Sequence, residues 1–160
     1  MTAAVDELDP TLVGRRLPGA VIAVPRHQAV IADHALYADD DPESGELAHT
    51  IWMLVIALRG MGISVDELCA LAEKRDDDTL LFGTCSIRQD RPLLVDRRYR
   101  STAVIDDIGR RVTRDGSLLD SITVTVELSD DERPDVAMGS VTSVYLFKRA
   151  RGSEAGDGDD

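Results

Sequence analysis

Carboxylates and an imidazole, the side chains most often used for enzymatic proton transfer, lie close together in this 160-residue chain. Asp39, Asp40 and Asp41 stand directly before Pro42, and His49 follows a few residues later. Carboxylates before a proline are equally typical of a solvated loop that ends a helix. A histidine beside a helix start is equally able to bond a backbone group and complete the packing. The residue types therefore allow acid–base chemistry and leave the structural interpretation open.

His49 begins the longest apolar run of the sequence, residues 47–63, which also contains the only tryptophan, Trp52. A helix that is apolar nearly all round is normally buried on all sides. The run is at the lower limit of length for a membrane span. Because strand-like alternation follows it, we predict instead one long helix that a sheet surrounds.

The other predicted elements have the right order to surround that helix. A β-branched segment at 20–24 is bounded by Pro18-Gly19 and Pro25 and predicts a strand. Further helices are predicted at 26–38 and at 64–73, and the second starts with the capping-box spacing of Ser64 and Glu67. Four more strands are predicted at 81–90, 98–112, 118–128 and 136–147, with a hairpin at Asp115-Gly116.

This order predicts an α+β domain, with antiparallel strands on one side and a central helix on the other. We expect a single domain over residues 13–150, a flexible lead-in at 1–12 and a disordered acidic tail at 151–160. The core must consist mainly of Val, Leu, Ile and Ala, because aromatic residues make up only 4% of the chain.

Charge and composition exclude several functions. A net charge of −12 argues against nucleic acid and anionic membranes as partners. The N-terminus shows no signal peptide, so a cytoplasmic location is expected.

Cys69 and Cys85 are interpreted as small buried hydrophobic residues. His27 and His34 lie two helical turns apart, too far to share a metal, so they predict a surface or dimer face. The Rossmann, P-loop and GxSxG motifs are missing, which argues against nucleotide binding and against ester hydrolysis by a serine triad. We expect no metal and no cofactor.

Three stretches resemble one known family. They are YADDDP at 37–42, LAHT at 47–50, and the segment from Gly83-Thr84 through Arg91-Pro92-Leu93 to Arg98-Tyr99. They resemble, respectively, the G-D-x-N-P loop, the A-H-G helix start, and the second strand with its following turn in MaoC-like (R)-specific enoyl-thioester hydratases and dehydratases. The resemblance implies the hotdog fold, in which a curved antiparallel sheet wraps around a long central helix.

The resemblance also implies a reaction and residue roles. The substrate would be an enoyl or 3-hydroxyacyl thioester of CoA or acyl carrier protein, as in fatty acid metabolism. Asp39 would be the base that activates water, His49 its partner, and the Thr50 N–H the donor to the thioester oxygen. Asp41 and Ser44 would contact the substrate. Ser44 stands where the family has its catalytic histidine.

Because that histidine is missing, two alternatives stay open. One is a non-catalytic hotdog subunit that lines the acyl tunnel of a heteromeric dehydratase. The other is a hotdog acyl-thioesterase with Asp39 or Glu43 as base. In each case the family implies a homodimer or heterodimer in which sheets pair edge to edge. A basic set could bind substrate phosphates, or could pair with the chain's own carboxylates: Arg88, Arg91, Arg97, Arg98 and Arg100.

Overall fold

The computed structural model describes residues 6–38 and 46–151. The strands are β1 (Arg16–Ala23), β2 (Thr79–Gln89), β3 (Arg98–Val112), β4 (Leu118–Asp130) and β5 (Ala137–Lys148). The helices are α1 (Arg26–Ala35), α2 (Ile51–Gly60), α3 (Val65–Leu71) and the 3-10 turn η1 (Pro10–Leu12).

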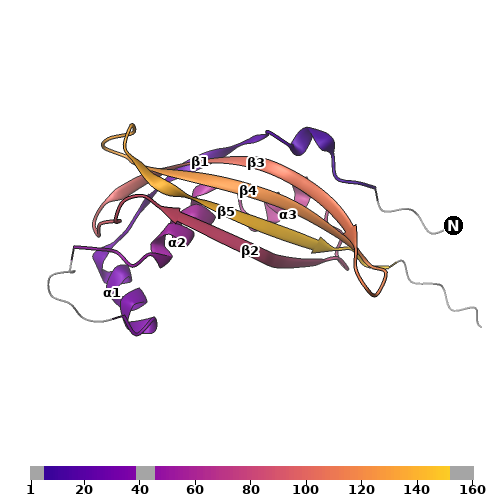
Figure 1. The fold of residues 1–160 in the computed structure, drawn as a ribbon, viewed down its shortest axis with the longest axis horizontal. Helices are drawn as coiled ribbons and strands as arrows, with labels where there is room; N and C mark the ends of the chain where they lie inside the picture. Colours follow the sequence, from indigo (N-terminus) through magenta and orange to yellow (C-terminus); the bar gives the residue numbers. More distant parts are fainter. Residues whose placement is uncertain (1–5, 39–45, 152–160) are drawn as a thin grey trace, which may run out of the picture.

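The five strands form one antiparallel sheet that curves around the helix α2 (Figure 1). The strand order is β1-β3-β4-β5-β2, so β1 and β2 form the two edges. The helix α2 contacts every strand of the sheet. The predicted α+β arrangement is confirmed.

Buried residues alternate with outward-facing residues along the central strands, and the buried set forms the face that packs on α2. Ile122, Val124 and Val126 of β4 are buried, and Val141 and Tyr145 of β5 lie beside them on the same face. The intervening side chains point to the outer, convex face, because successive strand residues alternate between faces. The bounds predicted for β3 are confirmed, and those of β2, β4 and β5 shift by one or two residues at one or both ends.

The predicted start of the first strand is wrong. Pro18 and Gly19 were expected to precede the strand, but β1 begins at Arg16 and contains both. A register shift against β3 lies between Leu17 and Ala20, and Gly19 has a φ of +71° there. An edge strand tolerates a proline at such a bulge, because its outer N–H groups have no ladder partner. The Gly19 N–H is satisfied by the Met61 carbonyl at 3.0 Å, just beyond the end of α2.

The central helix is shorter and less enclosed than predicted. It spans Ile51–Gly60 instead of residues 47–63, and Leu47 forms an isolated bridge with Leu94 of the link between β2 and β3. Its buried residues are Trp52, Met53, Ile56, Ala57 and Gly60, whereas Leu58 is 38% exposed. The expectation of burial on all sides is therefore corrected, because only the sheet side is fully covered.

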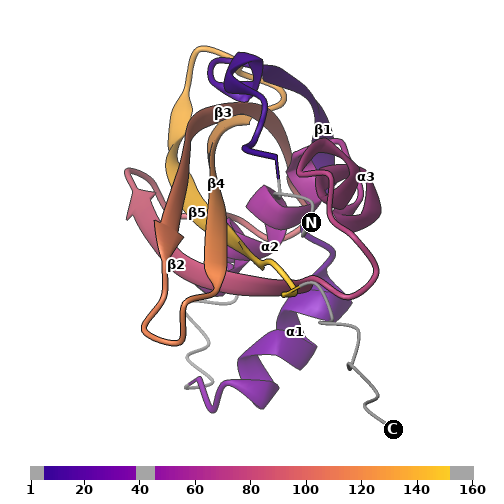
Figure 2. The same cartoon turned by 90° about the vertical axis from the view of Figure 1, so that its right-hand side faces the viewer.

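The shorter helices show one confirmed prediction and one correction. Ser64 Oγ accepts a hydrogen bond from the Glu67 N–H at 3.1 Å, which confirms the predicted start of α3. In α1 only Ala29 is buried, whereas Val30 and Ile31 are 60% and 66% exposed. In both views α1 lies on the side of the sheet where β2 forms the edge (Figure 1 and Figure 2).

Three further expectations can be compared with the described residues. Cys85 is exposed and Cys69 half-buried, so the prediction of two buried cysteines is wrong. Leu8 and Leu12, in the segment expected to be a lead-in, are buried against the core. The acidic tail beyond residue 151 lies outside the described residues. Among the described helices, none has the length and apolar character required to cross a membrane.

Candidate functional site at the start of the central helix

A cavity of about 370 Å³ lies at the N-terminal end of α2, and we call it the mouth cavity. It is lined from the helix side by Leu47, Ala48 and Thr50. On the other side it is lined by Gln89 at the end of β2, and by Asp90, Arg91 and Pro92 of the β2–β3 link. Two of the three sequence stretches that resemble MaoC-like proteins therefore meet at this cavity.

Backbone hydrogen bonds hold the helix start against that link. The Ala48 N–H donates to the Leu93 carbonyl at 2.8 Å, and the Val95 N–H donates to the Glu46 carbonyl at 3.0 Å. The buried Tyr99 hydroxyl accepts from the Leu94 N–H at 2.7 Å, and burial raises the pKa of this phenol. The start of α2 is thus fixed by β-type pairing, and this pairing explains why the helix begins later than predicted.

His49 is exposed and caps the first turn of α2. Its Nδ1 accepts a hydrogen bond from the Ile51 N–H at 3.0 Å, and its carbonyl accepts from the Trp52 N–H at 2.9 Å. A neutral imidazole that accepts at Nδ1 carries its proton on Nε2. In this arrangement His49 offers an N–H to a ligand or a water and is not free to act as a base at Nε2.

Thr50 presents a backbone donor at the same place. Its φ of −53° and ψ of −26° are already helical, and among the described residues no acceptor is hydrogen-bonded to its N–H. Its hydroxyl donates to Gln89 Oε1 at 2.9 Å, and Gln89 Nε2 donates to the Arg91 carbonyl at 3.2 Å. Thr50 was predicted from the sequence and Gln89 was not. The signal for Gln89 was only its position two residues before the Arg91-Pro92-Leu93 stretch.

The remaining predicted site residues, Asp39, Asp41 and Ser44, lie outside the described residues, as does Glu43. Glu46, the first described residue after that segment, is held by an ion pair. Arg26 contacts Glu46 at 3.2 Å, and its N–H and Nε each lie 3.1 Å from Asp96. The start of α1 is therefore linked to the residue that precedes the helix mouth.

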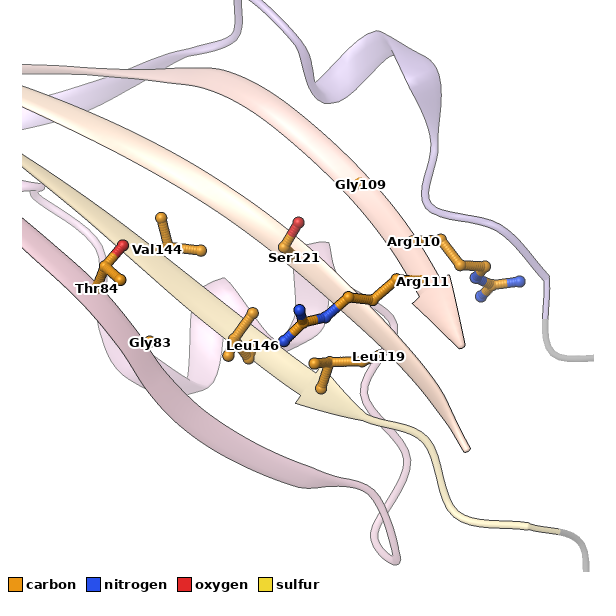
Figure 3. Close-up of a pocket in the computed structure, with 9 residues that line it drawn as sticks. All are labelled: Gly83, Thr84, Gly109, Arg110, Arg111, Leu119, Ser121, Val144 and Leu146. Atoms are coloured by element: carbon orange, nitrogen blue, oxygen red, sulfur yellow. The ribbon is translucent and has the colours of Figure 1, made fainter. Parts of the chain in front are cut away.

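A second hollow, of about 410 Å³, lies on the convex face of the sheet (Figure 3). Leu119, Ser121, Val144 and Leu146 line it, and they alternate with the residues that face α2. The missing side chain of Gly109 helps to open it, since a Cβ there would approach the Ser121 hydroxyl to 2.9 Å. Neither His49 nor Thr50 lines this hollow, so it is separate from the described residues of the predicted site.

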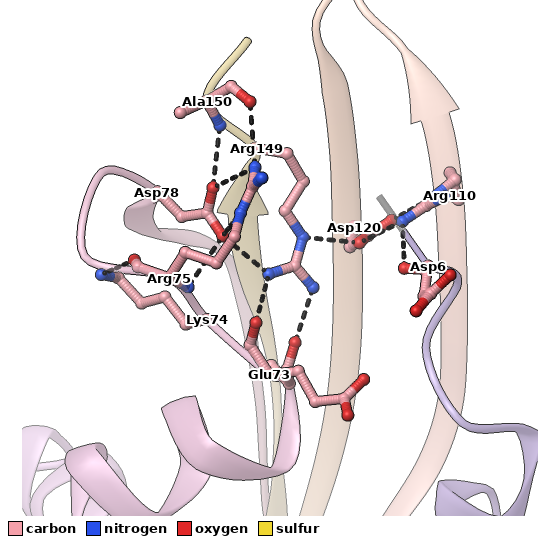
Figure 4. Close-up of polar contacts among 10 residues, drawn as sticks. Asp6, Glu73, Lys74, Arg75, Asp78, Arg110, Asp120, Arg149 and Ala150 are labelled. Atoms are coloured by element: carbon pink, nitrogen blue, oxygen red, sulfur yellow. Dashed lines mark hydrogen bonds and ion pairs between the residues drawn. The ribbon is translucent and has the colours of Figure 1, made fainter. Parts of the chain in front are cut away.

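Titratable groups also gather in the interior, in what we call the buried ionic cluster: Asp78, Asp120 and Arg149, with Arg75 and Arg110 at its edges (Figure 4). Arg149 Nε lies 2.8 Å from Asp120 and its Nη1 lies 3.0 Å from Asp78. Its Nη2 donates to the Ala72 carbonyl at 2.6 Å, just past the end of α3.

The cluster holds both of its buried carboxylates ionised. Burial alone would raise the pKa of Asp78 and of Asp120, but hydrogen bonds from the arginines, and for Asp78 from backbone N–H groups also, outweigh it and lower both pKa values. Their oxygens are already occupied by these arginines and backbone groups. The buried ionic cluster therefore joins the link between α3 and β2 to β4 and to the residue after β5, and it has a structural role.

No group of His, Cys, Asp and Glu side chains within residues 6–38 and 46–151 is arranged to hold a metal ion. In comparisons with known proteins, neither a family model nor a curated protein matches this chain. Solved structures do match it, at low sequence identity.

Three of these structures are instructive. The truncated HadBC complex of Mycobacterium tuberculosis, a 3R-hydroxyacyl-ACP dehydratase, shares 13% identity with a TM-score of 0.61, covering 84% of this chain and 96% of that one. A MaoC-like dehydratase from Rhodospirillum rubrum shares 13% identity with a TM-score of 0.57, covering 86% and 94%. The fluoroacetyl-CoA thioesterase FlK shares 17% identity with a TM-score of 0.57, covering 87% and 89%.

These similarities place the chain in the hotdog fold, which confirms the predicted fold class. MaoC-like dehydratases are among the structures that share it, so the resemblance seen in the sequence is supported at the level of the fold.

Proposed function

We propose that this protein is a MaoC-like hydratase or dehydratase that adds or removes water at an enoyl or 3-hydroxyacyl thioester of CoA or acyl carrier protein. The observation that carries the proposal is the Thr50 N–H, which has no acceptor among the described residues. It lies at the start of α2, in a residue that lines the mouth cavity. A backbone N–H at a helix start suits an oxygen that gains negative charge.

The reaction divides between three groups. Asp39 takes a proton from water, whose oxygen then bonds to the β-carbon of the enoyl group. The electron pair of the double bond moves toward the thioester, and the Thr50 N–H stabilises the enolate oxygen. The proton held by Asp39 then passes to the α-carbon. His49 donates Nε2–H to the attacking water and orients it, consistent with the hydrogen bond at its Nδ1. Dehydration is the reverse of these steps.

A non-catalytic role is the second candidate, and one observation favours it. Ser44 stands where the MaoC-like family has its catalytic histidine. The HadBC structure with the same fold is a complex of hotdog subunits. In this version the chain lines the acyl tunnel for a catalytic partner.

Turnover assays separate the candidates. The purified protein is expected to convert crotonyl-CoA to 3-hydroxybutyryl-CoA on its own, seen as loss of enoyl-thioester absorbance. Activity that appears only with a second hotdog subunit would support the non-catalytic version. Release of free thiol from a saturated acyl-CoA would support a thioesterase.

Assembly with a second hotdog subunit belongs to the same proposal, and β2 supplies the edge. Phe82 and Ile87 are on the helix-facing side of β2, yet they are 48% and 38% exposed. The helix α1, which carries the exposed apolar residues Val30 and Ile31, lies on the same side of the molecule (Figure 1 and Figure 2). A free strand edge flanked by apolar side chains is suited to pairing with another sheet.

Replacing Ile87 with lysine is expected to convert the assembled protein to a monomer, because a charge on a strand edge opposes pairing. Light scattering after size-exclusion chromatography measures the mass. Val112→Lys is the matched control, because Val112 is also exposed but lies on β3, separated from β2 by two strands. An Ile87→Lys protein with the mass of the wild-type assembly would contradict pairing through β2.

A further inference from the structure

The five arginines of the basic set predicted from the sequence differ in their ionic partners. Arg88 lies 3.5 Å from Asp90, while Arg97 and Arg100 lie 3.0 Å from Asp130 and Asp131. These three are explained by the chain's own carboxylates, as one of the two sequence interpretations expected.

Arg91 and Arg98 are the exceptions in this set. Both are exposed, and neither has a carboxylate within 4.0 Å among the residues that the structure describes. Only Arg91 lines the mouth cavity. The two residues therefore share exposure and charge but differ in position.

The backbone of Arg91 is fixed, while its guanidinium is left to solvent. Its N–H donates to the Met138 carbonyl at 3.3 Å, and its carbonyl accepts from Gln89 Nε2 at 3.2 Å. Since Gln89 also accepts from the Thr50 hydroxyl, two hydrogen bonds connect Arg91 to the proposed thioester-oxygen donor. Arg91 is thus an exposed cation on the lining of the mouth cavity, where it is available to the carrier arm of a thioester bound there.

We propose that Arg91 binds a phosphate of the pantetheine-linked carrier and so makes the site selective for phosphate-bearing thioesters. The inference rests on the proposed function and names the part of the substrate that this residue recognises. CoA and the prosthetic group of an acyl carrier protein both have a phosphate beyond the pantetheine. In a chain of net charge −12, an anionic carrier needs a local cation, and an unpaired arginine supplies one with several donors.

Binding measurements on the full chain test the assignment without requiring turnover. Calorimetry would compare crotonyl-CoA, crotonyl-acyl carrier protein and crotonyl-pantetheine, which lacks the phosphate. Arg91→Ala is expected to weaken binding of crotonyl-CoA, crotonyl-acyl carrier protein or both by about tenfold, the range of a charged hydrogen bond, and to leave crotonyl-pantetheine unchanged. The phosphate-bearing ligand that loses affinity identifies the carrier. Arg98→Ala, the matched control, should leave all three unchanged.

The binding results test the role of Arg91 separately from the proposed function. Equal loss for crotonyl-pantetheine, or no loss for either phosphate-bearing ligand, would overturn the role of Arg91 while the proposed function stands. A wild-type protein that binds none of the three ligands would overturn the proposed function, and this inference with it.

Discussion

Replacing Asp39 with asparagine is expected to slow the hydration of crotonyl-CoA by about 10²–10⁴-fold, the usual contribution of a positioned general base. Asparagine has nearly the same shape but accepts no proton from water at neutral pH. The effect should appear in kcat with little change in KM, because the proton transfer occurs only in the reaction and not on binding. The measurement is steady-state kinetics of the purified protein, or of its complex with a second hotdog subunit.

His49 provides the companion variant and needs a control for its capping role. His49→Asn retains an acceptor for the Ile51 N–H, which His49 Nδ1 now bonds at 3.0 Å, but it removes the Nε2–H. We expect His49→Asn to keep its thermal midpoint and to lose activity, whereas His49→Ala should lose both. Undiminished hydration by Asp39→Asn would remove the base assignment, and undiminished hydration by His49→Asn would reduce His49 to a helix cap.

The second large effect concerns stability. Replacing Arg149 with methionine should lower the free energy of unfolding by about 3–5 kcal/mol, because it leaves Asp78 and Asp120 buried without their shared cation. The side chain of Arg149 is only 3% exposed and those of both carboxylates are fully buried. For a chain of this size the thermal midpoint should fall by about 10 °C. Denaturant unfolding followed by circular dichroism measures the change.

Lys148→Met is the matched control. Lys148 precedes Arg149 and contacts Asp115 at 3.2 Å, but both side chains are about half exposed. Water and salt screen such a pair, so its loss should have a much smaller effect. Equal destabilisation by the two substitutions would contradict the importance of the buried ionic cluster.

The contribution of the buried ionic cluster to folding stability should depend on pH in a defined direction. The pKa values of Asp78 and Asp120 are lowered in the folded protein, so their contribution is present above the unfolded pKa of about 4 and is lost as the pH falls toward the folded values. The stability difference between wild type and Arg149→Met should therefore narrow below about pH 4. A constant difference across that range would contradict ionised carboxylates in the cluster.

The sequence was sufficient for the fold because the strands alternate clearly. From Ile122 to Leu128, β4 places its apolar residues on one face, and Asp115-Gly116 forms the predicted hairpin before the strand, with Gly116 at a φ of +79°. The errors arose where tertiary pairing overrides local signals. Pro18-Gly19 is a strong breaker, yet a bulge keeps it inside β1. Leu47 and Ala48 read as helical, yet they pair with the β2–β3 link.

The candidate site was predictable only in part. His49 and Thr50 were located from their position before an apolar helix and from the family resemblance. Gln89 was missed, because its contact with the helix start is a hydrogen bond from Thr50, a residue far away in the sequence. The buried ionic cluster has no local signature at all, since Asp78 and Arg149 lie 71 residues apart.

Amide NMR spectra recorded during a crotonyl-CoA titration test the central claim most directly, that the thioester binds at the start of α2. We predict that the largest shift change will occur at the Thr50 amide, with smaller changes at Ile51 and at Gln89 across the mouth cavity. Changes centred on the convex hollow around Ser121 and Val144, with an unmoved Thr50 amide, would contradict the account.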